Sequence, residues 1–322
     1  MKGAAWVNAI QGVFFSVMVF VLFFFVMMKN GGFIPTMEMV IAKHPKLFQI
    51  GWAGGKVWSY PMIFGMAAAM CLGCVCFPQP YMHAYSSRSV RGFKAMVLAF
   101  GGICLVVITM PTLIGIAGTI IVPGLKGVQA DKIYGLVASA TMPDWLAAFA
   151  VAGGFTAAMS TVNGLVFGNA TNISVDIIKI IRPETKQSDL INIARIFVGI
   201  IMAVCVVIAW NPNTPVAELS VIAFGTVAVT FFALWGAYYW ERATKTGAIL
   251  STLVGVGLNV TFFLVGGKKM VLFPQESLFN LNGFLASFIA SGVVFFVGCY
   301  LTQPGRIEEK SLKLFFHQSL TK

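Results

Sequence analysis

Two adjacent hydroxyl-bearing residues, Ser160 and Thr161, stand in the middle of a long apolar stretch, directly after Ala157-Ala158-Met159. No charged residue lies within a dozen positions on either side. Hydrocarbon offers such hydroxyls no water, so they need another partner. A desolvated monovalent cation is one such partner, because neutral oxygens suit modest affinity and release. This hypothesis makes Ser160 and Thr161 hydroxyl ligands and Ala157 a carbonyl ligand.

Small residues recur around these hydroxyls at intervals of three and four. Gly153, Ala157, Ser160, Gly164 and Gly168 therefore share one face of a helix. Such a stripe is typical of close helix–helix contact in membranes. It also fits a cation site, because a shared site needs a neighbouring helix to come close. The two interpretations are compatible, and the sequence leaves both open.

The composition is that of an integral membrane protein. The 322 residues are 58% hydrophobic and 10% charged, whereas soluble domains carry about 25% charged residues. The formal net charge of +11 comes from basic residues in the connections between apolar runs, so we expect no nucleic-acid partner.

Cys71, Cys74 and Cys76 lie in an apolar run, where we expect packing rather than a metal site. No soluble segment carries an enzyme motif, and we expect no enzyme activity.

Eight apolar runs are long enough to cross a membrane as helices. They are Ala4–Met28, Val57–Phe77, Ala95–Val122, Trp145–Phe167, Ile191–Trp210, Pro215–Tyr239, Gly247–Val265 and Leu281–Leu301. This pattern predicts an all-α multi-pass protein of the cell membrane, with a transmembrane domain over residues 1–302 and a tail over residues 303–322. Lys and Arg are more numerous on the side of the two chain ends, which predicts that both are cytoplasmic. We expect the basic tail to contact membrane lipid.

Helix breakers lie within two of the predicted spans. Residues 61–80 hold three prolines and two glycines, which favours a discontinuous second span. Pro111, with Gly115 and Gly118, lies within the third, where for a single proline we expect a packing kink rather than a break. The connections Ile34–Ile50 and Ala130–Ala140 are partly apolar and predict short helices on the outer side.

Acidic residues are absent from the apolar runs, apart from Glu218 and Glu241 at span edges. Carboxylates within a membrane usually mark proton relays. We therefore expect no proton-driven mechanism from this part of the chain.

Four motifs, in the same order along the chain, resemble motifs of the sodium:solute symporter family. Trp6–Gln11 resembles the WTDxxQ opening of the family's fifth core helix, and Gln79-Pro80 the GQPH end of the sixth. Ala157–Thr161 resembles the last five positions, AxMST, of the AAxMST pattern of the eighth, and Tyr239–Ala248 the YWxRxxxxGA junction after the tenth. The pantothenate-type branch is the most similar. The resemblance runs from Ala4 to about Gly305.

This resemblance implies part of a leucine-transporter-like bundle with a five-plus-five inverted repeat. The chain would supply core helices five to ten and two trailing helices, so it is expected to be N-terminally incomplete and unable to transport alone. Ala157, Ser160 and Thr161 would form half of a sodium (Na+) site, and the first core helix would supply the rest. Leu72, Cys76 and Pro80 would line the solute pocket. The implied function is sodium-coupled symport of a small organic solute, such as a carboxylate or the vitamin pantothenate.

Departures from the family pattern bear on the site. Asn8 stands where many relatives have Asp, so no carboxylate role is carried over, and Asn8 is kept as an ion-coupling candidate. Leu72 and Cys76 replace aromatic residues of the proline-transporting members, which disfavours proline as the solute. Two other functions stay open: a membrane sensor, or a structural or channel subunit built from the same helices. The oligomeric state is open as well.

Overall fold

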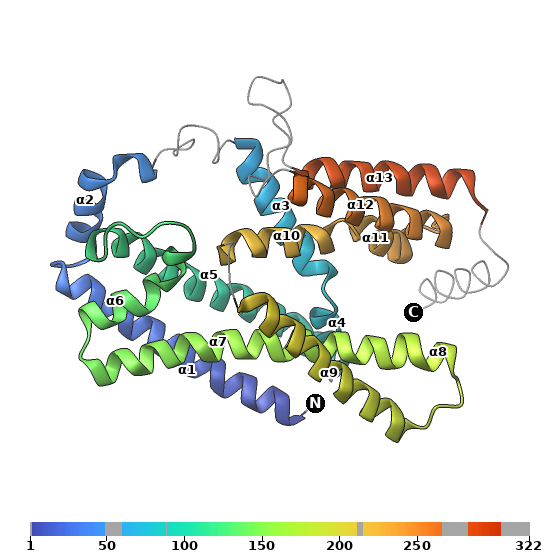
Figure 1. Ribbon diagram of the computed structural model, residues 1–322, viewed down its shortest axis with the longest axis horizontal. Helices are drawn as coiled ribbons and strands as arrows, with labels where there is room; N and C mark the ends of the chain where they lie inside the picture. The colour runs from blue at the N-terminus through green and yellow to red at the C-terminus, as the bar shows by residue number, and fades with distance from the viewer. Residues whose placement is uncertain (1, 49–59, 88, 211–214, 266–282, 304–322) are drawn as a thin grey trace. The chain divides into compact units, whose positions relative to one another are not determined.

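The structure is almost entirely helical. A computed structural model describes residues 2–48, 60–87, 89–210, 215–265 and 283–303, and within these ranges there is no β-strand. The helices, shown in Figure 1, are α1 (Lys2–Lys29), α2 (Phe33–Lys43), η1 (Pro45–Phe48), α3 (Tyr60–Cys76), α4 (Pro78–Ser86), α5 (Val90–Ile121), η2 (Gly127–Lys132), α6 (Ile133–Thr141), α7 (Asp144–Thr171), η3 (Asn172–Ile178), α8 (Lys179–Ile181), α9 (Gln187–Ala209), α10 (Val216–Ala228), α11 (Phe231–Tyr239), α12 (Lys245–Val265) and α13 (Gly283–Leu301). Of these, η1 and η2 are 3₁₀ helices and η3 is a π-helix.

Seven helical stretches are long and apolar enough to cross a membrane. They are Trp6–Lys29, Val90–Ile121, Asp144–Ile181, Gln187–Ala209, Leu219–Tyr239, Lys245–Leu264 and Gly283–Leu301. Each overlaps a predicted span, which confirms an all-α membrane protein. The remaining prediction, Val57–Phe77, corresponds to α3, in which Ile63–Cys76 is a shorter apolar helix. Its first residues, 57–59, lie outside the described ranges.

The second span is broken only at its end, since α3 runs without interruption through Gly65 and Gly73. Helix α3 ends at Cys76, and α4 begins at Pro78 after the single residue Phe77. Proline has no amide N–H, and the first position of a helix does not need one, so Pro78 suits the start of α4.

The third span is not broken at Pro111, because α5 continues through this residue. A proline removes one backbone hydrogen bond, and neighbouring hydroxyls can re-satisfy the local carbonyls. Thr109 and Thr112, on either side of Pro111, each donate a hydroxyl hydrogen bond to the carbonyl four residues earlier. One proline in a long apolar helix is therefore tolerated here.

Short helices are present where both connections predicted them, and their place on the outer side stays a prediction. The segment Ile34–Ile50 contains most of α2 and all of η1, and Ala130–Ala140 falls within η2 and α6. At the end of α1, the Lys29 ammonium donates a hydrogen bond to the carbonyl of Ala140. A cation at the last turn of α6 also suits the helix dipole.

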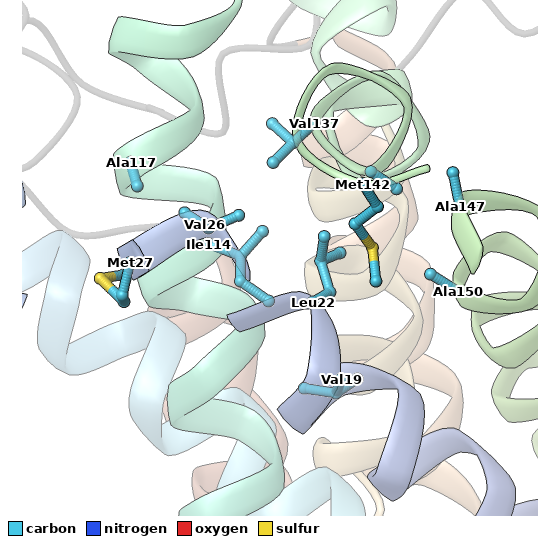
Figure 2. Packing of buried hydrophobic residues seen from close by; sticks show 11 residues of the cluster. Val19, Leu22, Val26, Met27, Ile114, Ala117, Val137, Met142, Ala147 and Ala150 are labelled. Atoms are coloured by element: carbon cyan, nitrogen blue, oxygen red, sulfur yellow. The ribbon is translucent and has the colours of Figure 1, made fainter. Parts of the chain in front are cut away.

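The first of two compact units comprises Met1–Pro45 and Pro78–Pro215. In this unit α1 packs against α5, α6 and α7. Its aliphatic core, shown in Figure 2, contains Val19, Leu22, Val26, Met27, Ile114, Ala117, Val137, Ala138, Met142, Ala147 and Ala150. Helix α7 contributes only alanines to this core, which lets α1 approach it closely.

The second unit comprises Lys46–Phe77 and Val216–Lys322. Here α3 packs against α10, and α12 packs along α13. Glycines make these contacts close. A Cβ atom placed on Gly73 would lie 2.6 Å from the carbonyl oxygen of Phe224, and one placed on Gly298 would lie 3.0 Å from the Cα atom of Gly247. Backbones therefore touch directly in this unit.

Candidate functional site

The small-residue stripe of α7 contacts two different helices. At Gly153, an added Cβ atom would lie 2.8 Å from the Cβ atom of Met18 on α1. At Gly164, it would lie 2.7 Å from Nε2 of Gln79 on α4. The turn that holds Ala157 and Ser160 lies between these two contacts along α7. The stripe is thus a helix-packing surface at both ends, with the hydroxyl-bearing turn between them.

The two hydroxyls of this turn share one acceptor. Ser160 Oγ donates to the carbonyl oxygen of Ala157 at 2.9 Å, and Thr161 Oγ1 donates to the same oxygen at 3.2 Å. Ser160 is half-buried and Thr161 is exposed on α7, which stays a regular α-helix here. A hydroxyl that donates its only proton keeps two oxygen lone pairs as acceptors. The arrangement therefore presents neutral oxygens and no free hydroxyl proton.

The electrostatics of the turn are those of a neutral site. Asp144 and Asp176, at the two ends of the continuous helical stretch, are both exposed. A monovalent cation at Ser160 would meet hydroxyl and carbonyl oxygens rather than a carboxylate. Neutral ligands allow entry and release, because they hold an ion less tightly than charged ones.

Helix α1 carries two buried amide oxygens that have no hydrogen-bond partner in the described residues, Asn8 Oδ1 and Gln11 Oε1. Figure 1 shows α1 and α7 running in opposite directions. Gln11 precedes Met18 by seven residues and Ser160 follows Gly153 by seven, a rise of about 10 Å in each helix. Both oxygens therefore lie on the helix that packs against α7, toward the N-terminal end of α1 from the Met18–Gly153 contact. Such orphaned oxygens are costly in a membrane and call for a partner.

The predicted solute-pocket residues belong to two different units. Leu72 is half-buried and packs against the second unit's small core of Ala69, Ala228, Val229 and Phe284. Cys76, also half-buried, has Thr230 as a side-chain hydrogen-bond partner. Pro80 belongs to the first unit and is exposed on α4.

Sequence reasoning missed two structural features near the site. The continuous helix after α7 widens into the π-helix η3, in which Ser174 is buried and donates to the carbonyl of Thr171 at 3.0 Å. π-Turns often occur at functional positions. The close approach of Gln79 to Gly164 was also not predicted, although both residues had been noted separately. Two features of the sequence could have indicated this contact. Gln79 is a polar residue beside a helix break, and Gly164 is a glycine of the small-residue stripe.

Tyr134, on the short helix α6, is a further buried polar group that the sequence did not single out. Its ring lies against α7, where a Cβ atom on Gly154 would be 3.4 Å from Cε1. Its hydroxyl is buried and has no hydrogen-bond partner among the residues that the structure describes. This burial raises the pKa of Tyr134 to about 12.

The fold and the stripe together define a multi-pass α-helical membrane protein with polar oxygens along one closely packed helix. Residues 1–255 match the sequence profile of the sodium:solute symporter family, and the chain belongs to that family. This is a family of membrane transporters, not of enzymes.

Similar proteins include the sodium/proline symporters of Staphylococcus aureus and of its strains JH9 and Newman. Each is 27% identical over 207 residues, which cover 62% of this chain and 40% of the relative. The chain thus matches less than half the length of these relatives.

Proposed function

We propose that the native gene product is a sodium-coupled symporter of a small organic solute, and that the sodium ion binds at Ala157, Ser160 and Thr161. The observation that carries this proposal is the shared acceptor of the two hydroxyls. Each hydroxyl donates its proton to the Ala157 carbonyl and keeps its lone pairs for a cation, whereas that carbonyl can ligate the ion only when the two hydroxyls turn away from it. Family membership makes sodium the expected co-transported ion.

Other hydroxyls in the chain also donate to their own helix, so this bond alone does not make a site. Thr109 of α5, for example, donates to the carbonyl of Leu105 and is exposed. The turn at Ser160 differs because it lies between two close helix contacts of α7, at Gly153 and Gly164. This position supports an ion site rather than a hydroxyl that only bonds to its own helix.

Asn8 is proposed as a residue of ion coupling. Its Oδ1 atom is a neutral carbonyl oxygen without a partner among the described residues, on the helix that packs against α7. The amide can ligate a cation without taking up a proton. Asn8 would then contribute to coupling without the carboxylate that many relatives carry at this position.

For the solute we propose a small organic carboxylate, bound near Leu72, Cys76 and Pro80. Pantothenate carries a carboxylate, and so does proline, which the similar staphylococcal symporters transport according to their names. We also propose that both ends of the chain face the cytoplasm, so that sodium moving inward drives uptake.

The proposal is tested with membrane vesicles from cells that express the native gene with its flanking sequence intact. Uptake of radiolabelled pantothenate and proline is measured under an inward sodium gradient and under a matched potassium gradient. We expect sodium-dependent uptake of one of these solutes or of a carboxylate that competes with it. Equal uptake under both gradients for all carboxylates tested contradicts sodium coupling.

The ion site is tested with Ser160→Ala and Thr161→Ala. Each change removes one neutral oxygen, and we expect the sodium concentration for half-maximal uptake to rise about tenfold, the equivalent of about 1.4 kcal/mol. Thr109→Ala is the matched control, because it removes a back-bonded hydroxyl of the same kind from an exposed position. If both α7 variants keep the wild-type sodium dependence, the site assignment is wrong.

A further inference from the structure

Gln79 is a polar residue that the proposed ion and solute sites do not use. It is half-buried, and it follows the break between α3 and α4 by only two residues. Its amide group lies directly over the backbone of Gly164 on α7. A Cβ atom at Gly164 would be 2.7 Å from Nε2 and 3.0 Å from Cδ of Gln79. Only a glycine leaves room for the amide in this position.

Gly164 lies on the same face of α7 as Ser160. The two residues are four positions apart, which is one helical turn and a rise of about 6 Å. The Gln79 amide therefore contacts the ion-binding face of α7 one turn beyond the hydroxyl of Ser160. Helix α4 as a whole packs against α7 in the same unit.

Gln79 also adjoins the proposed solute pocket in the chain. Pro80, one of the pocket residues, is the next residue of α4. A movement of α4 relative to α7 at the Gln79–Gly164 contact would displace Pro80 with it. One side-chain contact thus joins the helix of the ion site to a residue of the solute site.

We propose that Gln79, lying on Gly164, is a positioning residue that couples sodium binding on α7 to the solute-binding position of α4. The inference rests on the proposed function, since it assigns the contact through which the two sites communicate. Sodium binding at Ser160 orders the turn of α7 against which Gln79 packs, and the ordered turn then holds α4 and Pro80 in place. Loss of the contact leaves both sites present but weakens the dependence of one on the other.

The contact can be altered without unfolding the protein. The atoms that meet a new methyl group at Gly164 are the far end of a flexible side chain, so Gly164→Ala is expected to displace the Gln79 amide rather than the backbone. Gln79→Ala removes the amide and leaves Gly164 unchanged. In the double variant, Gln79→Ala makes room for the methyl group of Gly164→Ala.

The experiment measures sodium activation curves and the KM for the solute in the vesicle assay described above. For Gly164→Ala and for Gln79→Ala we expect the sodium concentration for half-maximal uptake to rise about fivefold or more, a typical size for coupling between two sites. The double variant is expected to resemble Gln79→Ala, because both changes break one contact and their effects do not multiply. Gly199→Ala on α9 is the control, since a Cβ atom there meets nothing within 4 Å.

The outcomes separate this inference from the proposed function. If Gly164→Ala and Gln79→Ala lower only the maximal rate, in proportion to the amount of protein in the membrane, the contact is merely structural and the inference is overturned. If the two effects multiply in the double variant, Gln79 and Gly164 act independently and the inference is again overturned. If the wild-type protein shows no sodium dependence, the proposed function itself fails, and the inference falls with it.

Discussion

The two compact units satisfy their buried polar groups in different ways. In the second unit, polar side chains bond across helices. Ser291 of α13 donates to the carbonyl of Val229 at 2.7 Å, and Asn259 of α12 donates to Thr226 Oγ1 at 2.9 Å. In the first unit, three buried side-chain oxygens have no partner among the described residues, namely Asn8 Oδ1, Gln11 Oε1 and the Tyr134 hydroxyl.

The units also differ in what holds their helices together. The first has an aliphatic core of side chains from α1, α5 and α6 against alanines of α7. The second has a smaller core around Phe284, and glycines there bring one backbone into direct contact with another. This difference teaches that the second unit is a paired and closely packed scaffold, whereas the first keeps unpaired oxygens near the helix that carries the proposed ion site.

The largest effect is expected at a glycine of the second unit. Gly73→Ala places a methyl group 2.6 Å from the Phe224 carbonyl oxygen, so two backbones must separate. We expect a loss of about 3 kcal/mol in the free energy of unfolding, measured by denaturation of the purified protein in detergent. Gly257→Ala on α12 is the control, because a Cβ atom there meets nothing within 4 Å. Equal stability of the two variants contradicts direct backbone packing.

A smaller effect is expected from a cross-helix hydrogen bond of the same unit. Ser291→Ala leaves the buried Val229 carbonyl, at the junction of α10 and α11, without its hydroxyl donor. We expect a loss of about 1 kcal/mol in the free energy of unfolding. Ser220→Ala provides the comparison, since the exposed Ser220 hydroxyl bonds only to its own helix at Val216. A loss no greater than that of Ser220→Ala would show that the cross-helix bond adds nothing.

The smallest effect is expected at an unpaired group of the first unit. Tyr134→Phe removes a buried hydroxyl that has no described partner, so at pH 7 we expect stability to stay the same or rise by up to about 1 kcal/mol. A clear loss of stability at pH 7 would reveal a partner for this hydroxyl and weaken the contrast between the units.

The same residue predicts a dependence on alkaline pH. The pKa of Tyr134 is about 12 in the folded protein and about 10 in an unfolded chain. Its contribution to stability is therefore fully present below pH 10 and is lost as the pH rises through 12. Between these values the wild-type protein should lose stability more steeply than Tyr134→Phe.

Much of the fold could be predicted because it depends on properties that lie along the chain. Long apolar runs identify membrane helices, and Pro78 after a glycine-containing run identifies the break between α3 and α4. Pro111 removes one backbone hydrogen bond from α5 but does not break the helix. The neighbouring hydroxyls that offset this loss could not be foreseen from the proline alone. The π-helix η3 and the junction of α10 and α11 were not predicted, because no proline or glycine marks either.

The sequence by itself determined that this is a helical membrane protein of the sodium:solute symporter type, with two adjacent hydroxyls on one apolar helix. Hydropathy and motif order are local properties, so they can be recognised without knowing which helices meet. Only the tertiary structure decided that the α7 stripe contacts α1 at Gly153 and α4 at Gly164, and that the Asn8 and Gln11 oxygens are buried without described partners. Contacts between residues far apart in the chain depend on packing, which sequence spacing does not specify.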